Sequence, residues 1–317
     1  MISYTNMNNH HKLEHEESED IELKQDMRDK VRVLCWIMTS PKNAYKKAVH
    51  VNATWASRCN KHIFLSTDPK SGLPTAELNI TDGRKYLWGK TKAALKYLYD
   101  NELDNFDWFL KADDDTYVIV ENLRFMLMAY SPSDPLYFGC KFKPFVKQGY
   151  MSGGAGYAIS REALKRFVEV GLTDKKKCKQ GDTGAEDAEI GKCMKNIDAI
   201  AVDTRDYLGR HRMLPFSPMS HMALNASTPA WFKKYMYYPY KQGHDCCSNY
   251  MISFHYINQG VMYALDYFIY KLRLFASHHE HFQQYGTNGD SIYSRAQQFA
   301  TAYSQLNDTT LPIPADE

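Results

Sequence analysis

Short apolar runs alternate with amphipathic segments after residue 30 of the chain. The runs at 31–40 (VRVLCWIMTS) and 61–67 (KHIFLST) have the length and the β-branched content of buried strands. Between them, in residues 43–57, apolar side chains recur at helical spacing, at Ala44, Ala48, Val51 and Trp55. We therefore expect a strand, a helix and a second strand, in that order.

A second helix and a third strand follow. The segment from Gly89 (GKTKAALKYLYDNE) consists of helix-forming residues, and the segment from Phe106 (FDWFLKADDDTYV) begins as another buried strand. This alternation predicts an α/β fold in which a mostly parallel central sheet is flanked by helices. Because no internal repeat or strong boundary interrupts residues 31–276, we expect one domain there.

The two ends of the chain differ in composition from its centre. Residues 1–30 carry eight acidic and four basic side chains, a net charge of −4, and too few apolar positions to bury a helix face. Residues 277–317 begin with a stretch rich in Gln, His and Ser. We expect a disordered acidic stem at 1–30 and a flexible polar tail at 277–317.

The overall composition excludes several classes of protein. With 44% hydrophobic and 24% charged residues the chain is an ordinary globular protein, and its net charge of +2 creates no field that would attract nucleic acid or an anionic membrane. Aromatic residues make up 14% of the chain, with 23 tyrosines. They suit a surface that stacks on sugars or bases, although half-buried packing is an equally ordinary explanation for tyrosine.

Cysteines and glycosylation sequons indicate an oxidising compartment. The chain has 7 cysteines, and Asn-x-Ser/Thr sequons occur at Asn52, Asn79, Asn225 and Asn307. No apolar run reaches the roughly 18 residues that span a bilayer, and the first residues lack the layout of a signal peptide. A lumenal location therefore requires a membrane anchor or signal sequence outside this sequence.

The cysteines can pair in several ways, because sequence does not fix connectivity. Two pairs can each close a short loop, and the adjacent pair at 246–247 can form a vicinal bridge or pair elsewhere. The partition that we expect joins Cys35 to Cys59, Cys178 to Cys193 and Cys246 to Cys247, and leaves Cys140 as a buried free thiol.

Three aspartates directly follow the third expected strand. Ligands of open α/β sheets bind beyond the carboxyl ends of strands, which is where Asp113, Asp114 and Asp115 fall. A divalent cation relieves their repulsion, and oxygen ligands select Mg²⁺ or Mn²⁺ over zinc. On an extended backbone Asp113 and Asp115 face the same way, and Asp114 points back to the fold. A solvated turn is the alternative, but ordered structure is expected on both sides of this segment.

Five segments, taken in order, resemble the β1,3-glycosyltransferase family that includes Fringe and has the GT-A fold. FDWFLKADDDTYV matches the DxD motif of that family, and the others are WGKTKAALKYLY at 88–99, YMSGGAGYAISREAL at 150–164, GAEDAEIGKC at 184–193 and ISFHYI at 252–257. The resemblance covers about residues 31–275. It implies a GT-A-like catalytic domain at 31–276 that transfers a sugar from a nucleotide donor with inversion of configuration.

The resemblance also implies a substrate pair and a location. Galactose would move from UDP-galactose to O3 of GalNAc that is O-linked to Ser or Thr of a glycoprotein. The enzyme would act in the Golgi lumen as the soluble part of a single-pass type II membrane protein, and it would form a homodimer. A nucleic-acid partner is not expected.

The metal ligands implied by the resemblance come from two motifs. Asp115 would contact Mn²⁺ directly, Asp113 would contact the ribose or the metal through water, and His255 would be an additional ligand. A lone histidine on an apolar strand is otherwise usually a core residue. Imidazole favours Mn²⁺ over Mg²⁺, which prefers oxygen more strictly.

The donor site implied by the resemblance gathers residues from four segments. The end of the first strand would cradle uracil and ribose, a lysine would pair with the diphosphate, and two glycines would leave room for the hexose. A flexible turn and a solvated lysine are the alternative explanations. The donor-site candidates are Met38, Thr39, Asp82, Arg84, Lys90, Asp113, Gly153 and Gly154.

An aromatic-rich stretch at 228–240 (TPAWFKKYMYYPY) is the expected acceptor surface. Sugar rings carry an apolar CH face that stacks on aromatic side chains, and Trp231 follows Pro229 in a loop-like stretch. We expect Trp231 to bind GalNAc, and the resemblance adds Glu186 and Tyr256 to the acceptor site. Ordinary packing is the alternative.

Inverting displacement needs a group that takes the proton from the acceptor hydroxyl, usually a carboxylate. Glu186, Asp187 and Glu189 lie at the start of an expected helix, where the dipole favours negative charge in any case. The acidic-Asp-x-x-x-Gly pattern of the family assigns the base to Asp187 and leaves Glu186 to orient a sugar hydroxyl.

Two other functions are compatible with parts of the sequence. A catalytically inactive relative that acts as a chaperone or glycan-binding module would not need the acidic triplet. A metal-dependent phosphoryl transferase also uses aspartate clusters, but the chain lacks a phosphate-loop signature.

Overall fold

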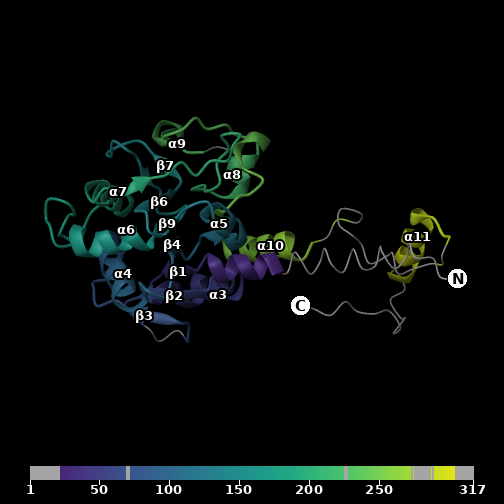
Figure 1. Ribbon diagram of the computed structural model, residues 1–317, viewed down its shortest axis with the longest axis horizontal. Coiled ribbons are helices and arrows are strands. Elements are labelled where there is room, and N and C mark those ends of the chain that lie inside the picture. Colours follow the sequence, from purple (N-terminus) through teal and green to yellow (C-terminus); the bar gives the residue numbers. More distant parts are fainter. Residues whose placement is uncertain are drawn as a thin grey trace. The chain divides into compact units, whose positions relative to one another are not determined.

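A seven-stranded mixed sheet is built from strands that lie between residues 33 and 201 (Figure 1). The structure is a computed structural model that describes residues 22–68, 72–224, 228–272, 274, 287 and 289–303. Four of the six neighbouring strand pairs are parallel, and the two pairs that include β9 are antiparallel. The expected α/β class with a mostly parallel central sheet is confirmed. The strands lie in the order β10 (Ile200–Ala201), β6 (Leu136–Gly139), β9 (Tyr157–Ser160), β4 (Trp108–Asp113), β1 (Val33–Met38), β2 (Lys61–Ser66) and β3 (Thr75–Glu77).

Helices cover both faces of this sheet. Figure 1 shows α4 (Leu87–Glu102), α6 (Arg161–Arg166) and α7 (Glu186–Asn196) on one side, and α3 (Val49–Ala53) and α5 (Val120–Leu127) on the other. The helix expected at 43–57 consists of four consecutive pieces: α2 (Pro41–Asn43), the π-helix η1 (Ala44–Ala48), α3 and the 3₁₀ helix η2 (Trp55–Arg58).

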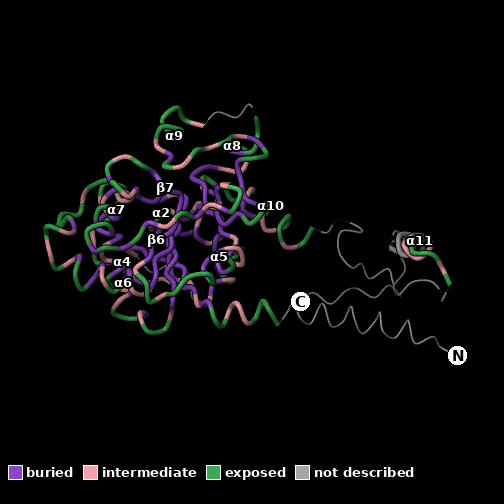
Figure 2. The backbone as a smooth tube through the Cα atoms, turned by 45° about the horizontal axis from the view of Figure 1, so that its top comes forward, coloured by how far each residue is buried: buried purple, intermediate pink, exposed green. Residues whose placement is uncertain are grey.

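Alternation along β1 explains why both faces need a cover. Cys35 and Ile37 face a core shared with α3 and α5, whereas Leu34 and Trp36 face a second core shared with α4, α6 and α7. All six residues of β1 are buried, as is typical of a central parallel strand. Figure 2 shows the buried residues in the interior of this part of the chain and the exposed residues toward its periphery.

Two small sheets lie outside the central one. β5 (Tyr117–Val118) pairs with β11 (Ser253–Phe254), and β7 (Lys141–Phe142) pairs with β8 (Tyr150–Met151), both in antiparallel fashion. The remaining elements are η3 (Arg84–Tyr86), η4 (Phe167–Gly171), α8 (Pro218–Met222), α9 (Ala230–Tyr235), η5 (His244–Cys246), α10 (Gln259–Tyr270) and α11 (Ile292–Tyr303).

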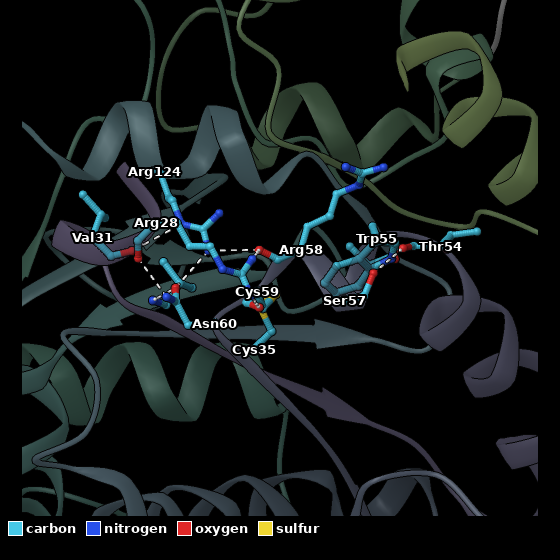
Figure 3. The surroundings of a disulfide bond; sticks show 12 residues. Arg28, Val31, Cys35, Thr54, Trp55, Ser57, Arg58, Cys59, Asn60 and Arg124 are labelled. Atoms are coloured by element: carbon cyan, nitrogen blue, oxygen red, sulfur yellow. Dashed lines mark hydrogen bonds between the residues drawn. A yellow bond between two sulfur atoms is a disulfide. The ribbon is translucent and has the colours of Figure 1, made fainter. Parts of the chain in front are cut away.

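The cysteines pair as expected. Disulfides join Cys35 to Cys59, Cys178 to Cys193 and Cys246 to Cys247, and Cys140 is a buried free thiol. The first disulfide ties β1 to the residue that follows η2, with 6.1 Å between the two Cα atoms (Figure 3). Beside it, the guanidinium of Arg124 donates to the carbonyl oxygens of Val31 and Arg58 and to Asn60 Oδ1, which fastens α5 to the same corner.

The ends of the described chain are more ordered than the sequence predicted. Residues 22–30, which we expected within a disordered stem, form a helix. Its i,i+4 pairs Gln25–Asp29 and Asp26–Lys30 support helical structure, and Arg28 donates to the carbonyl oxygens of Arg58 and Cys59. Within the expected flexible tail, α11 is a helix of 12 residues. The chain divides into two compact units, one of them Ser18–Tyr267, and α11 belongs to the other.

Among the described ranges, no helix combines the length and the apolar character needed to cross a bilayer.

Candidate functional site

The acidic triplet lies at the carboxyl end of β4, beside the end of β1. Asp113 pairs with Met38 in the parallel register of the two strands, and Thr116 N–H donates to Asp113 O to close the turn that follows. Asp114 is buried, and its Oδ2 accepts a hydrogen bond of 2.8 Å from Thr39 Oγ1. Asp114 therefore faces the fold, as predicted, and it ties the two strand ends together.

The pairing of β5 with β11 brings His255 to the triplet. Phe254 pairs with Tyr117, and Ile257 N–H donates to Asp115 O at 2.9 Å. The segment that contains His255 therefore runs alongside the segment that contains the aspartates. His255 Nε2 then lies 3.0 Å from Asp115 Oδ1 and 3.7 Å from Asp113 Oδ2. Three side chains from two distant parts of the sequence thus converge on one point.

Asp113, Asp115 and His255 form a set of groups that fits a divalent cation. One ligand atom from each lies within 4.8 Å of the others. His255 Nδ1 lies 3.3 Å from the carbonyl oxygen of Pro215, which can only accept a hydrogen bond, so Nδ1 carries a proton and Nε2 is the nitrogen that faces the carboxylates and would bind a metal.

Two lysines neutralise the outer carboxylates of this cluster. Lys47 Nζ lies 2.7 Å from Asp115 Oδ2 and 3.6 Å from Asp114 Oδ1, and Lys111 Nζ lies 2.6 Å from Asp113 Oδ1. Lys111 is buried within β4 and also donates to Gly153 O at 3.0 Å. The sequence analysis missed both residues, although a lysine inside the apolar run WFLKA was a visible signal.

Burial and charge act on the acidic triplet in opposite directions. Burial alone would raise the pKa of Asp115, but the hydrogen bond to His255 and the charge of Lys47 outweigh it, so the pKa lies below its usual range. For Asp114, burial prevails over the hydrogen bond from Thr39 and raises the pKa to about 6. The carboxylate expected to bind metal directly is therefore held ionised.

The glycine-rich loop between β8 and β9 separates the group formed by Asp113, Asp115 and His255 from the carboxylates of α7. A Cβ atom at Gly154 would lie 2.2 Å from His255 Nδ1, and one at Gly153 would lie 2.8 Å from Glu186 Oε2. Thr116 Oγ1 donates to Gly154 O and holds the loop against the turn. Glycine is thus required at both positions because the loop backbone closely approaches His255 and Glu186. This structural requirement explains the two glycines in addition to their expected role in admitting the sugar.

Glu186 and Asp187 begin α7 on the far side of this loop. Glu186 Oε1 accepts hydrogen bonds from Thr91 Oγ1 at 2.9 Å and Tyr157 Oη at 2.8 Å, so Glu186 is firmly oriented. The Oδ1 atom of Asp187 accepts from Ala188 N–H at 2.9 Å. Burial raises the pKa of both carboxyl groups, and the charge of Lys111 opposes this effect in each. A carboxylate with a raised pKa is a stronger proton acceptor.

Most of the expected nucleotide-binding residues meet at the end of β1. Met38 is buried there, and the buried Lys90 donates to Thr39 O at 3.0 Å and to Asp82 Oδ1 at 2.7 Å. Lys90 therefore joins Thr39 to Asp82 in this structure rather than standing in solvent. Arg84 is exposed in η3, the short helix that follows Asp82.

The expected acceptor residues belong to a cluster of aromatic rings. Trp231 lies in the first turn of α9 and not in a loop, and 43% of its surface is exposed. Its ring contacts that of Phe216, and Phe216 stacks in turn on Tyr256, which is 58% exposed. Tyr256 and Trp231 are thus linked through one buried ring, and the ring of Tyr256 lies 4.0 Å from that of His255.

A cavity of about 680 Å³ opens beside the acidic triplet. The helical segment after β1 contributes Lys46, Lys47 and His50, and the start of α10 contributes Gln259, Gly260 and Met262. Asp114, Asp115 and Tyr256 complete the wall nearest the cluster. The expected metal ligand Asp115 is therefore accessible from this side.

The sequons differ in accessibility. Asn79 is exposed, whereas Asn52 lies in α3, is half-buried and has its Oδ1 2.8 Å from His62 Nε2. Asn225 and Asn307 lie outside the described residues. Asn79 is the more suitable of the two described sequons for glycosylation.

Comparison with known proteins identifies relatives. Residues 29–216 match the family model described as Fringe-like. The chain is 45% identical over 276 residues to the glycoprotein-N-acetylgalactosamine 3-beta-galactosyltransferase 1 of Xenopus laevis. The aligned residues cover 86% of this chain and 76% of that protein. It is 29% identical over 150 residues to the beta-1,3-glucosyltransferase of Mus musculus, covering 46% of this chain but only 30% of that protein.

Among solved structures, the galactosyltransferase LgtC is similar over 62% of this chain and 84% of that chain, with 12% identity and a TM-score of 0.37.

Proposed function

Because this chain belongs to the Fringe-like family, we propose that it is an inverting β1,3-galactosyltransferase, a core 1 β1,3-galactosyltransferase in activity. It moves galactose from UDP-galactose to O3 of GalNAc that is O-linked to Ser or Thr of a glycoprotein. Identity of 45% that extends over 76% of a galactosyltransferase acting on glycoprotein GalNAc supports this reaction. The observation that carries the chemistry is the placement of Asp113, Asp115 and His255 across the Gly153–Gly154 loop from Asp187.

The metal site supports the departure of UDP. When bound by Asp115, His255 and Asp113, a Mn²⁺ ion supplies charge compensation to the diphosphate that leaves. The low pKa of Asp115 keeps this ligand ionised, and the Nδ1–H of His255 bonded to Pro215 O keeps Nε2 aimed at the site. Lys111 holds Asp113 in place from within β4.

Asp187 is the proposed general base. The O3 oxygen of GalNAc forms a bond to the anomeric carbon of galactose while the bond from that carbon to the diphosphate breaks, and the O3 proton moves to Asp187. Attack opposite to the leaving group inverts the configuration. Burial raises the pKa of Asp187, which strengthens it as a proton acceptor. Glu186, held by Thr91 and Tyr157, orients a sugar hydroxyl.

The remaining site residues bind the two substrates in this proposal. Met38, Thr39 and the Asp82–Lys90 pair form the uridine side, with Arg84 at its exposed edge. The backbone of Gly153 and Gly154 admits the hexose. Trp231 and Tyr256 supply exposed rings on which GalNAc can stack.

The proposed location is the Golgi lumen, with the chain as the soluble part of a type II membrane protein. Three disulfides support an oxidising compartment. The homodimer expected from the family resemblance belongs to this proposal as well.

UDP release tests the proposal. We expect the purified protein with Mn²⁺ to release UDP from UDP-galactose when a GalNAc-threonine glycopeptide is present, and much less with UDP-GlcNAc, UDP-glucose or the unglycosylated peptide. Mass spectrometry of the product should show one added hexose. Binding of the glycopeptide without any sugar transfer would instead support a binding module.

A further inference from the structure

An arc of aromatic rings connects the two sides of the proposed site. From His255 the ring contacts run through Tyr256, Phe216, Trp231 and Tyr235 to Phe145 and Tyr150, with neighbouring centroids 4.0 to 6.2 Å apart. Tyr150 in turn packs on α7, because a Cβ atom at Gly191 would lie 2.2 Å from Tyr150 Cβ. Gly191 is one turn after Asp187 on the same helix face. The arc therefore runs from a proposed metal ligand to the helix of the proposed base.

Three rings of this arc are exposed. Tyr256 and Trp231 are 58% and 43% exposed, and both already belong to the proposed acceptor site. Phe145 is 67% exposed, more than either of them, and no role has been assigned to it. It lies farther along the arc than Trp231, separated from it by the half-buried ring of Tyr235.

Phe145 is held outward by a strained turn. Its φ of 68° is in the left-handed region, which a bulky side chain rarely adopts. Val146 N–H donates to Pro144 O at 2.9 Å and closes a γ-turn centred on Phe145. The flanking residues are anchored, because Val146 is buried and Lys143 N–H donates to Tyr235 O at 2.8 Å. Strain that presents an apolar ring to solvent points to a function of that ring.

We propose that Phe145 contacts the peptide of the acceptor, beyond the GalNAc that stacks on Trp231. This inference rests on the proposed function and names the part of the substrate that reaches past the sugar. The occupant follows from the proposed acceptor, in which a single GalNAc is attached to a peptide, so the part of the acceptor that reaches past the sugar is peptide. Phe142, which is buried, contacts Trp231, Tyr235 and Tyr150 and supports these rings from within the fold. Exposed aromatic rings suit an extended, proline-rich chain, whose rings stack on aromatic side chains.

Two acceptors separate the peptide from the sugar. We expect Phe145→Ala to raise the KM for a proline-containing GalNAc-threonine glycopeptide about fivefold, and to leave kcat/KM for methyl α-GalNAc within twofold of the unmodified protein. Phe145→Gly should have the same effect on the glycopeptide with no loss of thermal stability, because glycine accepts the positive φ. Phe125→Ala removes another exposed phenylalanine outside the arc and should change neither acceptor.

Equal changes for both acceptors, or no change for either, would overturn the role of Phe145 and leave the proposed function standing. If the unmodified protein transferred galactose to neither acceptor, the proposed function would be overturned instead, and this inference with it.

Discussion

The ammonium group of Lys47 lies 2.7 Å from Oδ2 of Asp115, the carboxylate whose Oδ1 faces His255. The same ammonium lies 3.6 Å from Asp114. Lys47 is therefore an internal cation beside the proposed metal position. A divalent ion that binds Asp115 must share this carboxylate with Lys47 or displace it, so protein and metal charges compete for one group.

Replacing Lys47 by Met should strengthen the binding of Mn²⁺ alone by about fivefold, because a competing and repelling charge is removed from a half-exposed ion pair. Electron paramagnetic resonance of free Mn²⁺ during titration measures this affinity. Lys46→Met is the matched control, since Lys46 lines the same cavity without an ion pair to Asp115 among the contacts described. Weaker Mn²⁺ binding by Lys47→Met would show that Lys47 supports the metal site instead.

Removing a metal ligand should abolish most activity and leave the fold intact. Asp115→Ala and His255→Ala each take away one proposed ligand without removing core volume, so we expect turnover to fall at least about 100-fold. Chelation of the unmodified protein should have the same effect, and added Mn²⁺ should restore it. His244→Ala, at an exposed position, serves as the control. Full activity after thorough chelation would refute the metal mechanism.

Asp187→Asn should reduce kcat by about 10² to 10⁴-fold while UDP binding persists, because proton transfer matters in the transition state more than in the ground state. Isothermal titration with UDP and Mn²⁺ checks the binding. Glu189 lies two residues after Asp187 and is paired with Lys192, so Glu189→Gln should keep near-normal turnover. Retained turnover in Asp187→Asn would move the base elsewhere.

The raised pKa of Asp187 sets the direction of the pH dependence. The base acts only when deprotonated, so kcat/KM should be full above this pKa and fall as the pH drops through it. Because burial raises the pKa, the fall should begin at a higher pH than for an exposed aspartate, whose pKa is about 3.9. The acid limb should persist in Glu189→Gln. A rate profile flat down to the ordinary range of aspartate would contradict this role.

Gly154→Ala tests the packing of the glycine loop on the metal ligand. The new Cβ atom would lie 2.2 Å from His255 Nδ1, so either the ring or the loop must shift. We expect Mn²⁺ affinity and turnover to fall at least about tenfold. Gly181→Ala has open space around the new Cβ and should behave as the unmodified protein. Normal Mn²⁺ binding by Gly154→Ala would contradict the prediction that this loop fixes the position of the His255 ring.

The local elements of the fold were predictable because their signals are local. The apolar runs that form β1, β2 and β4 can each be seen in their own segment of the sequence. The aspartates lie where β4 ends. Asp114 facing inward followed from strand alternation alone. The resemblance added His255 and Asp187, which no local pattern could have connected to the triplet.

Contacts between distant segments escaped the sequence analysis. Lys47, in η1, looks like an ordinary charged residue until the fold brings it against Asp115, which is 68 positions away. The helix at 22–30 has few apolar positions and is fastened by Arg28 to carbonyl groups of residues 58 and 59, an interaction invisible in its own sequence. Trp231 was placed in a loop because Pro229 precedes it, yet proline is equally suited to the start of a helix.

The joining of β5 to β11 has a consequence for the lifetime of the protein. Asp115 and His255 are about 140 positions apart, so an unfolded chain rarely presents them together, and closing such a loop has a large entropic cost. An ion that binds at this junction in the folded state alone would shift the folding equilibrium toward that state, and the shift would grow with the ion concentration relative to its dissociation constant. Manganese supply in the compartment would then govern how much of this protein survives, in addition to how fast each copy works.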